Sequence, residues 1–437
     1  MATCAEVVAR TLKENGISTI FGLPGGEVLD FLEACRREGL SFVLTRHEAA
    51  AAFMADVTGQ ITRRPGVCLS TLGPGATNLV SGVANAFLDR SPVLAITGQM
   101  STRAAPYCTH QRIDLSSLFQ PVTKQSIVLD ARNTRSKVER AIEIATQGRM
   151  GPVHLLLPSD MAAQQDESYQ ADEAEANVYA SYSDERLMEK ALAELNQARH
   201  PLVIVGVGVD PVGSSAIIAD FIEKTRIPVM VTPKAKGLVS ETNPLFLATA
   251  AGMAGDRVIV EFLQDVDLVV GIGFDPVESD KMWHKEKKIL SIDTASTADG
   301  SYAPFLELIG DVNAILTRFL TAYTSNHAWE EKKLRAFRDE MREVSSSPVA
   351  ASRRGLSPYH VILKLRQLLS PNAVLTTDVG AHKLLLGQLW ETYEPLTFFM
   401  SNGFSSMGYG FPAAMAARLQ FPDREVVSVS GETAAFS

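Results

Sequence analysis

The sequence predicts an α/β protein with three doubly wound parallel-sheet domains. Short apolar runs rich in β-branched residues alternate with segments of helical periodicity along the whole chain. Two stretches of polar residues divide this alternation into three blocks. Apolar runs of this length, separated by helices, are typical of strands buried on both faces of a parallel sheet.

The first block predicts a domain over residues 1–160. Thr3 and Glu6 form the pattern of a capping box, so a helix is expected to begin there and to end near Gly16. A polar, acidic stretch over residues 159–183 predicts a linker. The expected strands lie in the runs TIFGLP, SFVLT, GVCLSTL, PVLAITG and GPVHLLLP.

The second block predicts a domain over residues 184–345, which ends in a heavily charged helical segment. Its glycine-containing stretch GVGVDPVG is only loosely similar to a dinucleotide-binding turn, because Asp210 and Pro211 interrupt it. We therefore expect a plain turn there. The expected strands lie in the runs PLVIVGVGV, IPVMVTP, DLVVGIG and KKILSID.

The third block predicts a domain over residues 357–437, after a second linker in SSSPVAASRRG. A helix in SPYHVILKLRQLL is followed by strands in AVLTTDVG and TFFMS, a helix in FPAAMAARLQ and a strand in EVVSVSG. A doubly wound domain usually needs more than ~100 residues. We therefore expect this domain to be truncated.

Composition narrows the classes of function. The chain has 437 residues and a formal net charge of −9 without a basic block, which argues against nucleic acid or an anionic membrane surface as the main partner. Its four cysteines form no C-x-x-C pair, so neither a zinc site nor a disulfide framework is expected, and a reducing cytoplasm fits. No apolar run approaches the ~18 residues of a membrane span, and the helix expected at Thr3 leaves no room for a signal peptide.

Two glycine-rich loops, FGLPGG and STLGPGATN, each follow an apolar run and precede a helix. In a parallel sheet both loops would lie at the carboxyl edge, where backbone N–H groups can bind an anion. The first loop contains Gly25 and Gly26. Either loop alone is equally consistent with a simple tight turn.

Glu48 lies between these loops, directly after the run SFVLT and before the apolar stretch from Ala49 to Met54. This position predicts the first turn of a helix, where a carboxylate interacts favourably with the helix dipole. A buried Glu48 would be a candidate proton carrier, whereas an exposed one would only stabilise the helix. From the residues alone the exposed position is favoured, and the buried one stays open. The neighbouring His47 has no metal-ligand spacing to another histidine or cysteine, so a capping or core role is expected.

Seven segments in this order resemble one enzyme family over essentially the whole chain. They are FGLPGG, RHEAAAAFMAD, GPGATNLVSGVANAF, ITGQ, THQRIDLSSLFQPVTK, TDVGAH and SMGYGFPAA. The family is the thiamine-diphosphate-dependent enzymes of the acetolactate (acetohydroxyacid) synthase group. THQ-x-x-D, GFDPVE and SNG are more similar to the catabolic than to the anabolic enzymes.

The resemblance implies a pyrimidine-binding domain, a central domain and a diphosphate-binding domain, in that order. It also implies that the cofactor, thiamine diphosphate, bridges the first domain of one subunit and the third domain of another, so that the active protein is a homodimer or homotetramer. Whether the central domain holds FAD, as it does in some relatives, is left open.

The resemblance also assigns roles to residues near the reacting carbon of the cofactor. Glu48 would hydrogen-bond the pyrimidine ring, and Met407 would hold the two rings in a bent arrangement. Gly25 and Gly26 would let the backbone approach the reacting carbon. Gln111 and Lys124 would line the substrate side.

At the other end of the cofactor, Val379, Gly380 and His382 would contact the diphosphate. Magnesium would bind beside Gly431, where the family has Gly-Asp-Gly and this chain has Gly-Glu-Thr. Glu432 would be the metal ligand, but its additional methylene moves the carboxylate by ~1.5 Å. Thr433 adds a Cβ where a backbone amide should approach phosphate. We therefore expect weak or absent metal–diphosphate binding by the chain as given.

The activity implied is decarboxylation of pyruvate and addition of the acyl unit to a second 2-oxo acid. A 2-oxo-acid decarboxylase or another lyase of the same family is an alternative, because acceptor choice depends on the shape of the pocket. The Gly-Glu-Thr departure fits three explanations, namely a truncated enzyme, a noncatalytic relative, or a partner subunit that supplies the missing half. We favour the first, because Glu48, Met407 and the glycine loops are intact.

Overall fold

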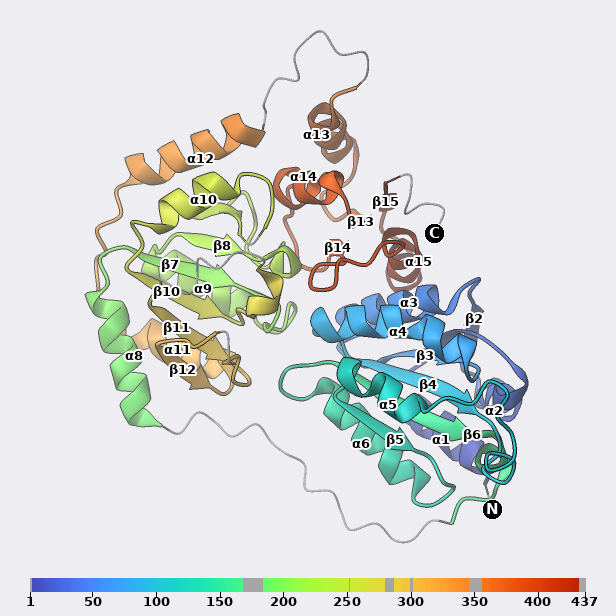
Figure 1. Ribbon diagram of the computed structural model, residues 1–437. Helices are drawn as coiled ribbons and strands as arrows, with labels where there is room; N and C mark the ends of the chain where they lie inside the picture. The colour runs from blue at the N-terminus through green and yellow to red at the C-terminus, as the bar shows by residue number, and fades with distance from the viewer. Residues whose placement is uncertain are drawn as a thin grey trace. The chain divides into compact units, whose positions relative to one another are not determined.

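The computed structural model describes residues 2–167, 184–250, 252–279, 287–298, 302–345 and 356–431. Within these residues the strands form three parallel sheets of six, six and three strands (Figure 1), which confirms the predicted fold class. The first compact unit contains the described residues up to 167 together with Phe404–Pro422. The second contains those from 184 to Gly403 and from Asp423 to 431. Most of both predicted linkers lies outside the described residues.

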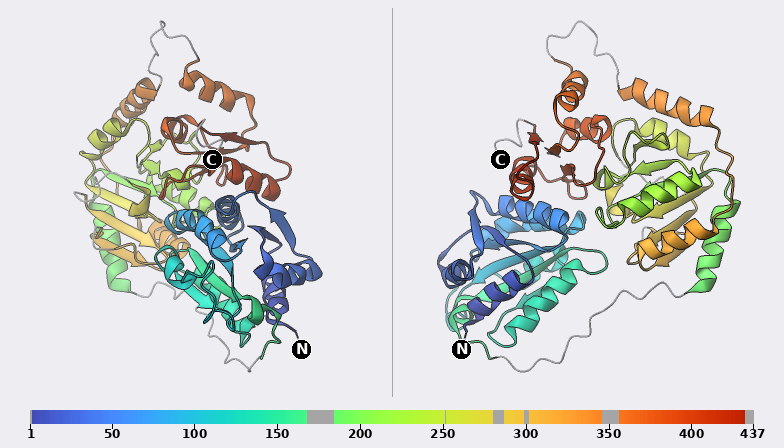
Figure 2. Two further views of the ribbon diagram at one scale, coloured as in Figure 1. Left: turned by 45° about the vertical axis from the view of Figure 1, so that its right-hand side comes forward. Right: turned by 180° about the vertical axis from the view of Figure 1, so that it is seen from behind.

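The first sheet has the strand order β2-β1-β3-β4-β6-β5. Helices cover both of its faces (Figures 1 and 2), with α3 and α4 packed together on one face and α1, α2 and α6 on the other. The strands are β1 (Thr19–Leu23), β2 (Ser41–Leu44), β3 (Gly66–Ser70), β4 (Val93–Gln99), β5 (Gln125–Val128) and β6 (Pro152–Pro158), and the helices are α1 (Cys4–Glu14), α2 (Leu29–Glu38), α3 (Glu48–Thr62), α4 (Pro74–Leu88) and α6 (Thr134–Thr146). All residues of β3 and β6 are buried, as expected for central parallel strands.

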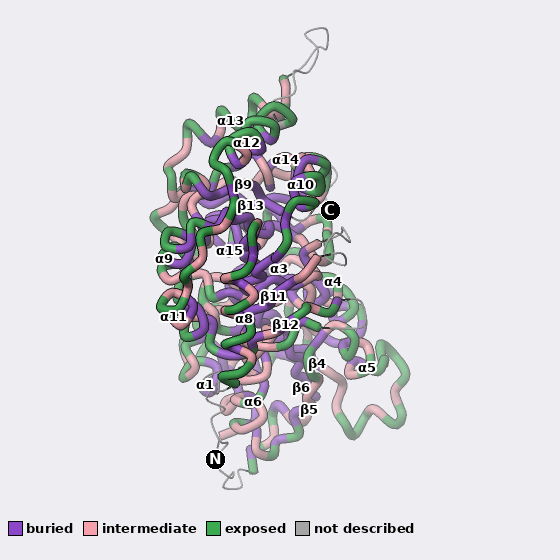
Figure 3. The backbone as a smooth tube through the Cα atoms, turned by 90° about the vertical axis from the view of Figure 1, so that its left-hand side faces the viewer, coloured by how far each residue is buried: buried purple, intermediate pink, exposed green. Residues whose placement is uncertain are grey.

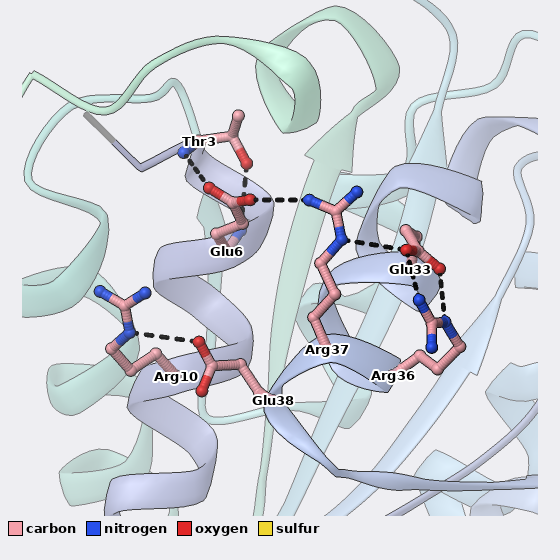
Figure 4. Close-up of polar contacts among 7 residues, drawn as sticks. All are labelled: Thr3, Glu6, Arg10, Glu33, Arg36, Arg37 and Glu38. Atoms are coloured by element: carbon pink, nitrogen blue, oxygen red, sulfur yellow. Dashed lines mark hydrogen bonds and ion pairs between the residues drawn. The ribbon is translucent and has the colours of Figure 1, made fainter.

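Helix α1 begins with the predicted capping box (Figure 4). The Thr3 hydroxyl accepts a hydrogen bond from the Glu6 N–H at 3.2 Å, and the Glu6 carboxylate accepts one from the Thr3 N–H at 3.0 Å. Arg37 of α2 joins the carboxylates of Glu6 and Glu33 at 3.3 and 2.9 Å. These ion pairs are largely exposed, so they orient the two helices more than they stabilise the fold.

The central sheet has the strand order β12-β11-β10-β7-β8-β9. One face packs against α8, α9 and α11, and the other packs against α10 and α12. The strands are β7 (Pro201–Val205), β8 (Val229–Val231), β9 (Phe246–Thr249), β10 (Leu268–Ile272), β11 (Ile289–Asp293) and β12 (Leu306–Ile309), and the helices are α8 (Glu185–Gln197), α9 (Ser215–Thr225), α10 (Asp256–Leu263), α11 (Val312–Ala322) and α12 (Glu331–Ser345). Along α9 and α11 buried and exposed segments alternate (Figure 3), because each helix turns one side to the core.

The third sheet has the order β14-β13-β15, with β13 (Val374–Thr377) in the centre. Its core is formed with α13 (Pro358–Leu368) and α14 (Ala381–Leu389). Strands β14 (Phe398–Met400) and β15 (Val426–Val429) belong to the second unit, whereas α15 (Gly410–Gln420) between them belongs to the first unit, where it packs on α3. Among the residues that the structure describes, no helix is both long enough and apolar enough to cross a membrane.

A buried ion pair joins the central domain to the third sheet within the second unit. The Lys236 ammonium, whose side chain is fully buried, contacts the Glu241 carboxylate and lies 3.2 Å from the Thr249 hydroxyl. Glu241 also accepts hydrogen bonds from the N–H and the hydroxyl of Thr392, at 3.2 and 2.8 Å. The pair is therefore fully partnered, and losing one member would leave an unpaired buried charge.

We predict that Lys236→Met lowers the free energy of unfolding by about 3 kcal/mol, because it leaves the Glu241 carboxylate buried without its counter-charge. Urea denaturation monitored by circular dichroism measures this. The exposed pair of Arg257 and Glu261 provides the control, since Arg257→Ala should cost less than about 1 kcal/mol. Equal effects of the two substitutions would contradict a structural role for the buried pair.

Candidate active site

The switch point of the first sheet lies between β1 and β3, because the chain leaves these neighbouring strands in opposite directions. Both glycine-rich loops follow these strands and meet at this carboxyl edge. A Cβ added at Gly25 would lie 2.4 Å from the Thr71 hydroxyl, so only glycine fits against the second loop. A Cβ added at Gly26 would have no described atom within 4 Å, so its backbone faces open space.

Glu48 is buried at the start of α3, with a relative exposure of 4%. This excludes the exposed position that the residues alone favour. The side-chain amide of Asn78, on α4, donates to Oε2 of Glu48 at 3.0 Å. Among the described residues, none donates a hydrogen bond to the other carboxylate oxygen, Oε1. The site therefore holds a buried carboxylate with one oxygen available to a ligand.

His47 caps α3, as expected. Its Nδ1 accepts a hydrogen bond from the Ala49 N–H at 3.1 Å, which fixes the first turn that carries Glu48.

Close packing of α3 on α4 sets the position of Glu48. A Cβ at Gly82 would lie 2.4 Å from Cβ of Ala52, and a Cβ at Gly75 would lie 3.0 Å from Oε1 of Glu48. Deeper in the same interface, Asn85 donates to the buried Asp56 carboxylate at 2.7 Å. The two helices are thus held in one arrangement by small residues and by a buried polar bond.

Gln111 and Met407 lie in the same unit as Glu48. The backbone oxygen of Gln111 would be 2.9 Å from a Cβ at Gly73, so Gln111 lies beside the second glycine loop. Met407 is 48% exposed, and the hydroxyl of its neighbour Ser406 lies 3.3 Å from that of Ser81, one turn beyond Asn78 on α4. The buried Tyr409 ring packs edge-on against Phe53 of α3, which anchors the Met407 turn.

Lys124 does not lie at this edge. Its N–H donates to the carbonyl of Pro152, the first residue of β6, at 2.8 Å, and its Nζ donates to the Gln147 carbonyl at 2.7 Å. Because all strands of the sheet are parallel, the first residue of β6 marks the amino edge, opposite Glu48. Partial burial of the ammonium lowers the pKa of Lys124 to about 8.

The second group of predicted residues lies in the second unit, at the carboxyl ends of β13 and β15. Gly380 precedes α14 with φ of +149°, a conformation that favours glycine. The Val379 N–H donates to the Asp378 carboxylate at 2.8 Å. The His382 ring lies beside Gly380 and Gly431, since Cβ atoms built there would be 2.8 and 3.2 Å from Cε1 of the ring. The structure thus brings these four predicted residues together.

The His382 imidazole has one nitrogen free for a ligand. Its Nε2 is buried and has no hydrogen-bond partner among the described residues. The ring also makes a hydrogen bond to the backbone of Asp378, and this bond by itself raises the pKa of His382. The other ring nitrogen, Nδ1, is therefore the donor in this bond. Burial lowers the pKa of His382, which keeps the free ring neutral. A helix N-terminus with an unpartnered imidazole nitrogen fits an anionic diphosphate.

The predicted metal ligand, Glu432, and its neighbour Thr433 lie outside the described residues. Within residues 2–431, apart from the gaps, no group of three or more His, Cys, Asp or Glu side chains could hold a metal ion. Magnesium at this edge therefore stays a prediction.

The loop after β7 does not fit a flavin dinucleotide. The Gly206 and Gly208 amides donate to Ile272 and Gly273 at 2.9 and 2.8 Å, and the Val207 amide donates to the Glu278 carboxylate at 2.9 Å. The amides that would bind a pyrophosphate are therefore already occupied by the protein. The stretch forms the plain turn expected from the sequence.

Three residues around Glu48, namely Glu27, Thr71 and Asn78, have no role that could be predicted from the sequence. Thr71 donates to the Glu27 carboxylate at 2.5 Å and contacts Gly25, so it joins the two glycine loops. Asn78 holds Glu48. The sequence indicates a role for them only through their position within or directly after the glycine-rich loops. The bond between Thr71 and Glu27 joins residues 44 positions apart and therefore leaves no local sequence pattern.

Three family models match the chain in order. Residues 2–118 match the N-terminal thiamine pyrophosphate (thiamine diphosphate) binding domain of thiamine pyrophosphate enzymes, residues 188–319 match the central domain, and residues 378–437 match the C-terminal binding domain. The chain therefore belongs to the thiamine pyrophosphate enzyme family.

Within this family the chain is similar to acetolactate synthases. It is 31% identical to acetolactate synthase of Bacillus subtilis (strain 168), over 98% of this chain and 76% of the relative. It is 32% identical to a probable acetolactate synthase large subunit of Methanocaldococcus jannaschii, over 98% and 75%. It is 31% identical to the large subunit of acetolactate synthase isozyme 1 of Escherichia coli (strain K12), over 98% and 77%. The chain thus spans about three quarters of the length of each relative.

We predict that Gly82→Ala lowers the free energy of unfolding by about 2 kcal/mol, because the new methyl group overpacks the contact between α3 and α4. Urea denaturation measures the loss. Gly26→Ala is the matched control, since its methyl group meets no described atom, and it should cost less than about 0.5 kcal/mol. A neutral Gly82→Ala would refute the close helix contact.

We predict that His382→Asn weakens binding of thiamine diphosphate about ten-fold at pH 6 and less at pH 8. The free ring is neutral, so donation of a proton from Nε2 to the diphosphate requires proton uptake, and wild-type affinity should fall more steeply with rising pH than that of the variant. Isothermal titration at both pH values measures this. Parallel pH profiles for the two proteins would exclude His382 as a diphosphate ligand.

Proposed function

We propose that the chain is a thiamine-diphosphate-dependent carboligase of the acetolactate synthase type, which decarboxylates pyruvate and adds the acyl unit to a second 2-oxo acid. The observation that supports it most is the Glu48 carboxylate, which is buried at the switch point. One of its oxygens is bonded to Asn78, and the other has no donor among the residues that the structure describes. The family membership and the names of the relatives supply the reaction class.

In this proposal each residue group holds one end of the cofactor. Oε1 of Glu48 binds the pyrimidine ring, and Met407 holds the bend between the rings. Val379, Gly380 and His382 bind the diphosphate. Gly431 and Glu432 are the residues that would bind magnesium. When bound, the cofactor supplies the electron sink that loss of carbon dioxide requires.

The residues of the chain then act by placing protons and excluding water. Glu48 shares a proton with the ring nitrogen, and its burial strengthens this bond because few waters compete for it. Gly25 and Gly26 leave room for the reacting carbon, and Gln111 faces the substrate. Lys124 lies at the opposite edge of the sheet from Glu48, and its role on the substrate side stays a prediction.

We further propose a cytoplasmic homodimer or homotetramer in which subunits complete each other's sites. Pyruvate is the proposed donor substrate, as the acetolactate synthase names of the relatives suggest.

We predict that Glu48→Gln lowers the rate of carbon dioxide release from pyruvate at least about 100-fold, because the amide cannot exchange a proton with the pyrimidine. The assay contains thiamine diphosphate and magnesium, and acetoin formed after acidification reports carboligation. Glu6→Gln is the control, since Glu6 also begins a helix but only caps it. Acetaldehyde in place of acetoin would identify a simple decarboxylase, and no cofactor binding by the full-length product of the source gene would overturn the proposal.

A further inference from the structure

The central sheet also has a switch point, between β7 and β10. Ligands of doubly wound sheets bind in the crevice at the carboxyl ends of such strands. Here the crevice contains Glu278, the last residue of the 3-10 helix Pro276–Glu278 that follows β10. Its relative exposure is 4%.

The Glu278 carboxylate accepts three hydrogen bonds from loops after other strands. Oε2 accepts from the Val207 N–H at 2.9 Å and from the Thr232 hydroxyl at 2.8 Å. Oε1 accepts from the Lys234 N–H at 3.1 Å. Two backbone amides and a hydroxyl that converge on one anion are the donors that a bound phosphate or carboxylate would use.

Burial and hydrogen bonding act on the Glu278 carboxylate in opposite directions. Burial raises the pKa of Glu278 to about 7, and the bonds from Thr232, Val207 and Lys234 oppose that rise. The nearby Asp275 carboxylate raises the pKa of Glu278 further. The three donors therefore offset part of the cost of burying the ionised carboxylate, which is the predominant form above pH 7.

Glu278 is also connected to the segment after β14. The Asn402 side-chain amide donates to the backbone carbonyl of Glu278 at 3.4 Å. The backbone N–H of Lys234 donates to Glu278, and the ammonium of the same residue donates to the Met400 carbonyl at 3.3 Å. Glu278 thus takes part directly in one contact with residues 400–402, through its backbone carbonyl, and its carboxylate holds the backbone of Lys234, which makes another. In the sequence this segment leads directly to the Met407 turn.

We propose that Glu278 is a positioning residue, an internal anion that fills the ligand crevice of the central domain and thereby holds the segment Met400–Asn402. The consequence for catalysis rests on the proposed function, in which Met407 contacts the cofactor. The central domain then needs no external anion, because its own carboxylate satisfies the donors. Removal of the carboxylate should create a binding site for a small free carboxylate in its place.

The first test uses Glu278→Ala and formate. The variant leaves the three donors unpaired, so its Tm should fall, and 100 mM formate should restore about half of the loss, whereas chloride at the same ionic strength should not. Asp293→Asn is the matched control, since Asp293 is a buried acid at the end of β11 in the same domain and burial raises its pKa to about 6. Asp293→Asn should lower Tm without rescue by formate.

The second test uses Glu278→Gln, which keeps the shape of the side chain and so preserves the fold if Glu278→Ala does not fold. The glutamine amide places an N–H donor opposite the donors of Val207, Thr232 and Lys234, so the segment before Met407 should shift. As a result, kcat should fall about ten-fold while KM for pyruvate stays constant. The Asp293→Asn control should keep the wild-type kcat.

These readouts separate the two proposals. An inactive wild-type protein whose Glu278→Ala variant is still rescued by formate refutes the carboligase but keeps the internal anion. Loss of Tm in Glu278→Ala without rescue, or a Glu278→Gln kcat equal to that of Asp293→Asn, overturns the positioning role.

Discussion

The bond between Asn78 and the buried Glu48 carboxylate is the interaction on which the site depends. A carboxylate removed from water must be hydrogen-bonded, and among the described residues a donor is found for only one of the two Glu48 oxygens. Asn78 can reach it only because α3 and α4 approach closely at Gly75 and Gly82. The glycines therefore determine the chemistry indirectly, since they place the donor that leaves Oε1 open to a ligand.

The three sheets use their carboxyl edges differently. The edges of the first and third sheets present two groups that have no partner in the described part of the chain, Oε1 of Glu48 and Nε2 of His382. The edge of the central sheet is closed by Glu278, which binds the available donors itself. A fold that offers the same crevice three times thus leaves two crevices open to a ligand and uses the other to hold its own backbone.

Much of this fold could be predicted from the sequence. Apolar runs marked the inner strands of the two large sheets correctly, because parallel strands buried on both faces show no polar alternation. The runs missed β5, β9 and β12, which lie at the edges of these sheets. The burial of Glu48 could not be decided in the same way. The residues that follow it are nearly all small and apolar, so the helix shows no polar face from which the direction of Glu48 could be read. The structure settles it through α4, which begins 26 positions later in the chain.

Other features depend on contacts between distant segments. Glu278 appears in the quoted run GFDPVE, but its donors lie 71, 46 and 44 positions away. The packing of α15 on α3 is likewise not local. The matching motif also did not reveal that Lys124 lies at the amino edge of its sheet, and its role on the substrate side stays a prediction.

The most direct test of the account follows the hydrogen on the thiazolium carbon between nitrogen and sulfur of bound thiamine diphosphate. Its exchange with deuterium, measured by acid quench and proton NMR, reports whether Glu48 activates the cofactor without any substrate present. In the wild-type protein, Glu48 should make the hydrogen of the bound cofactor exchange faster than that of the free cofactor. In Glu48→Gln the bound cofactor should exchange at the rate of the free cofactor. Equal exchange in both bound forms would contradict a role for the buried carboxylate.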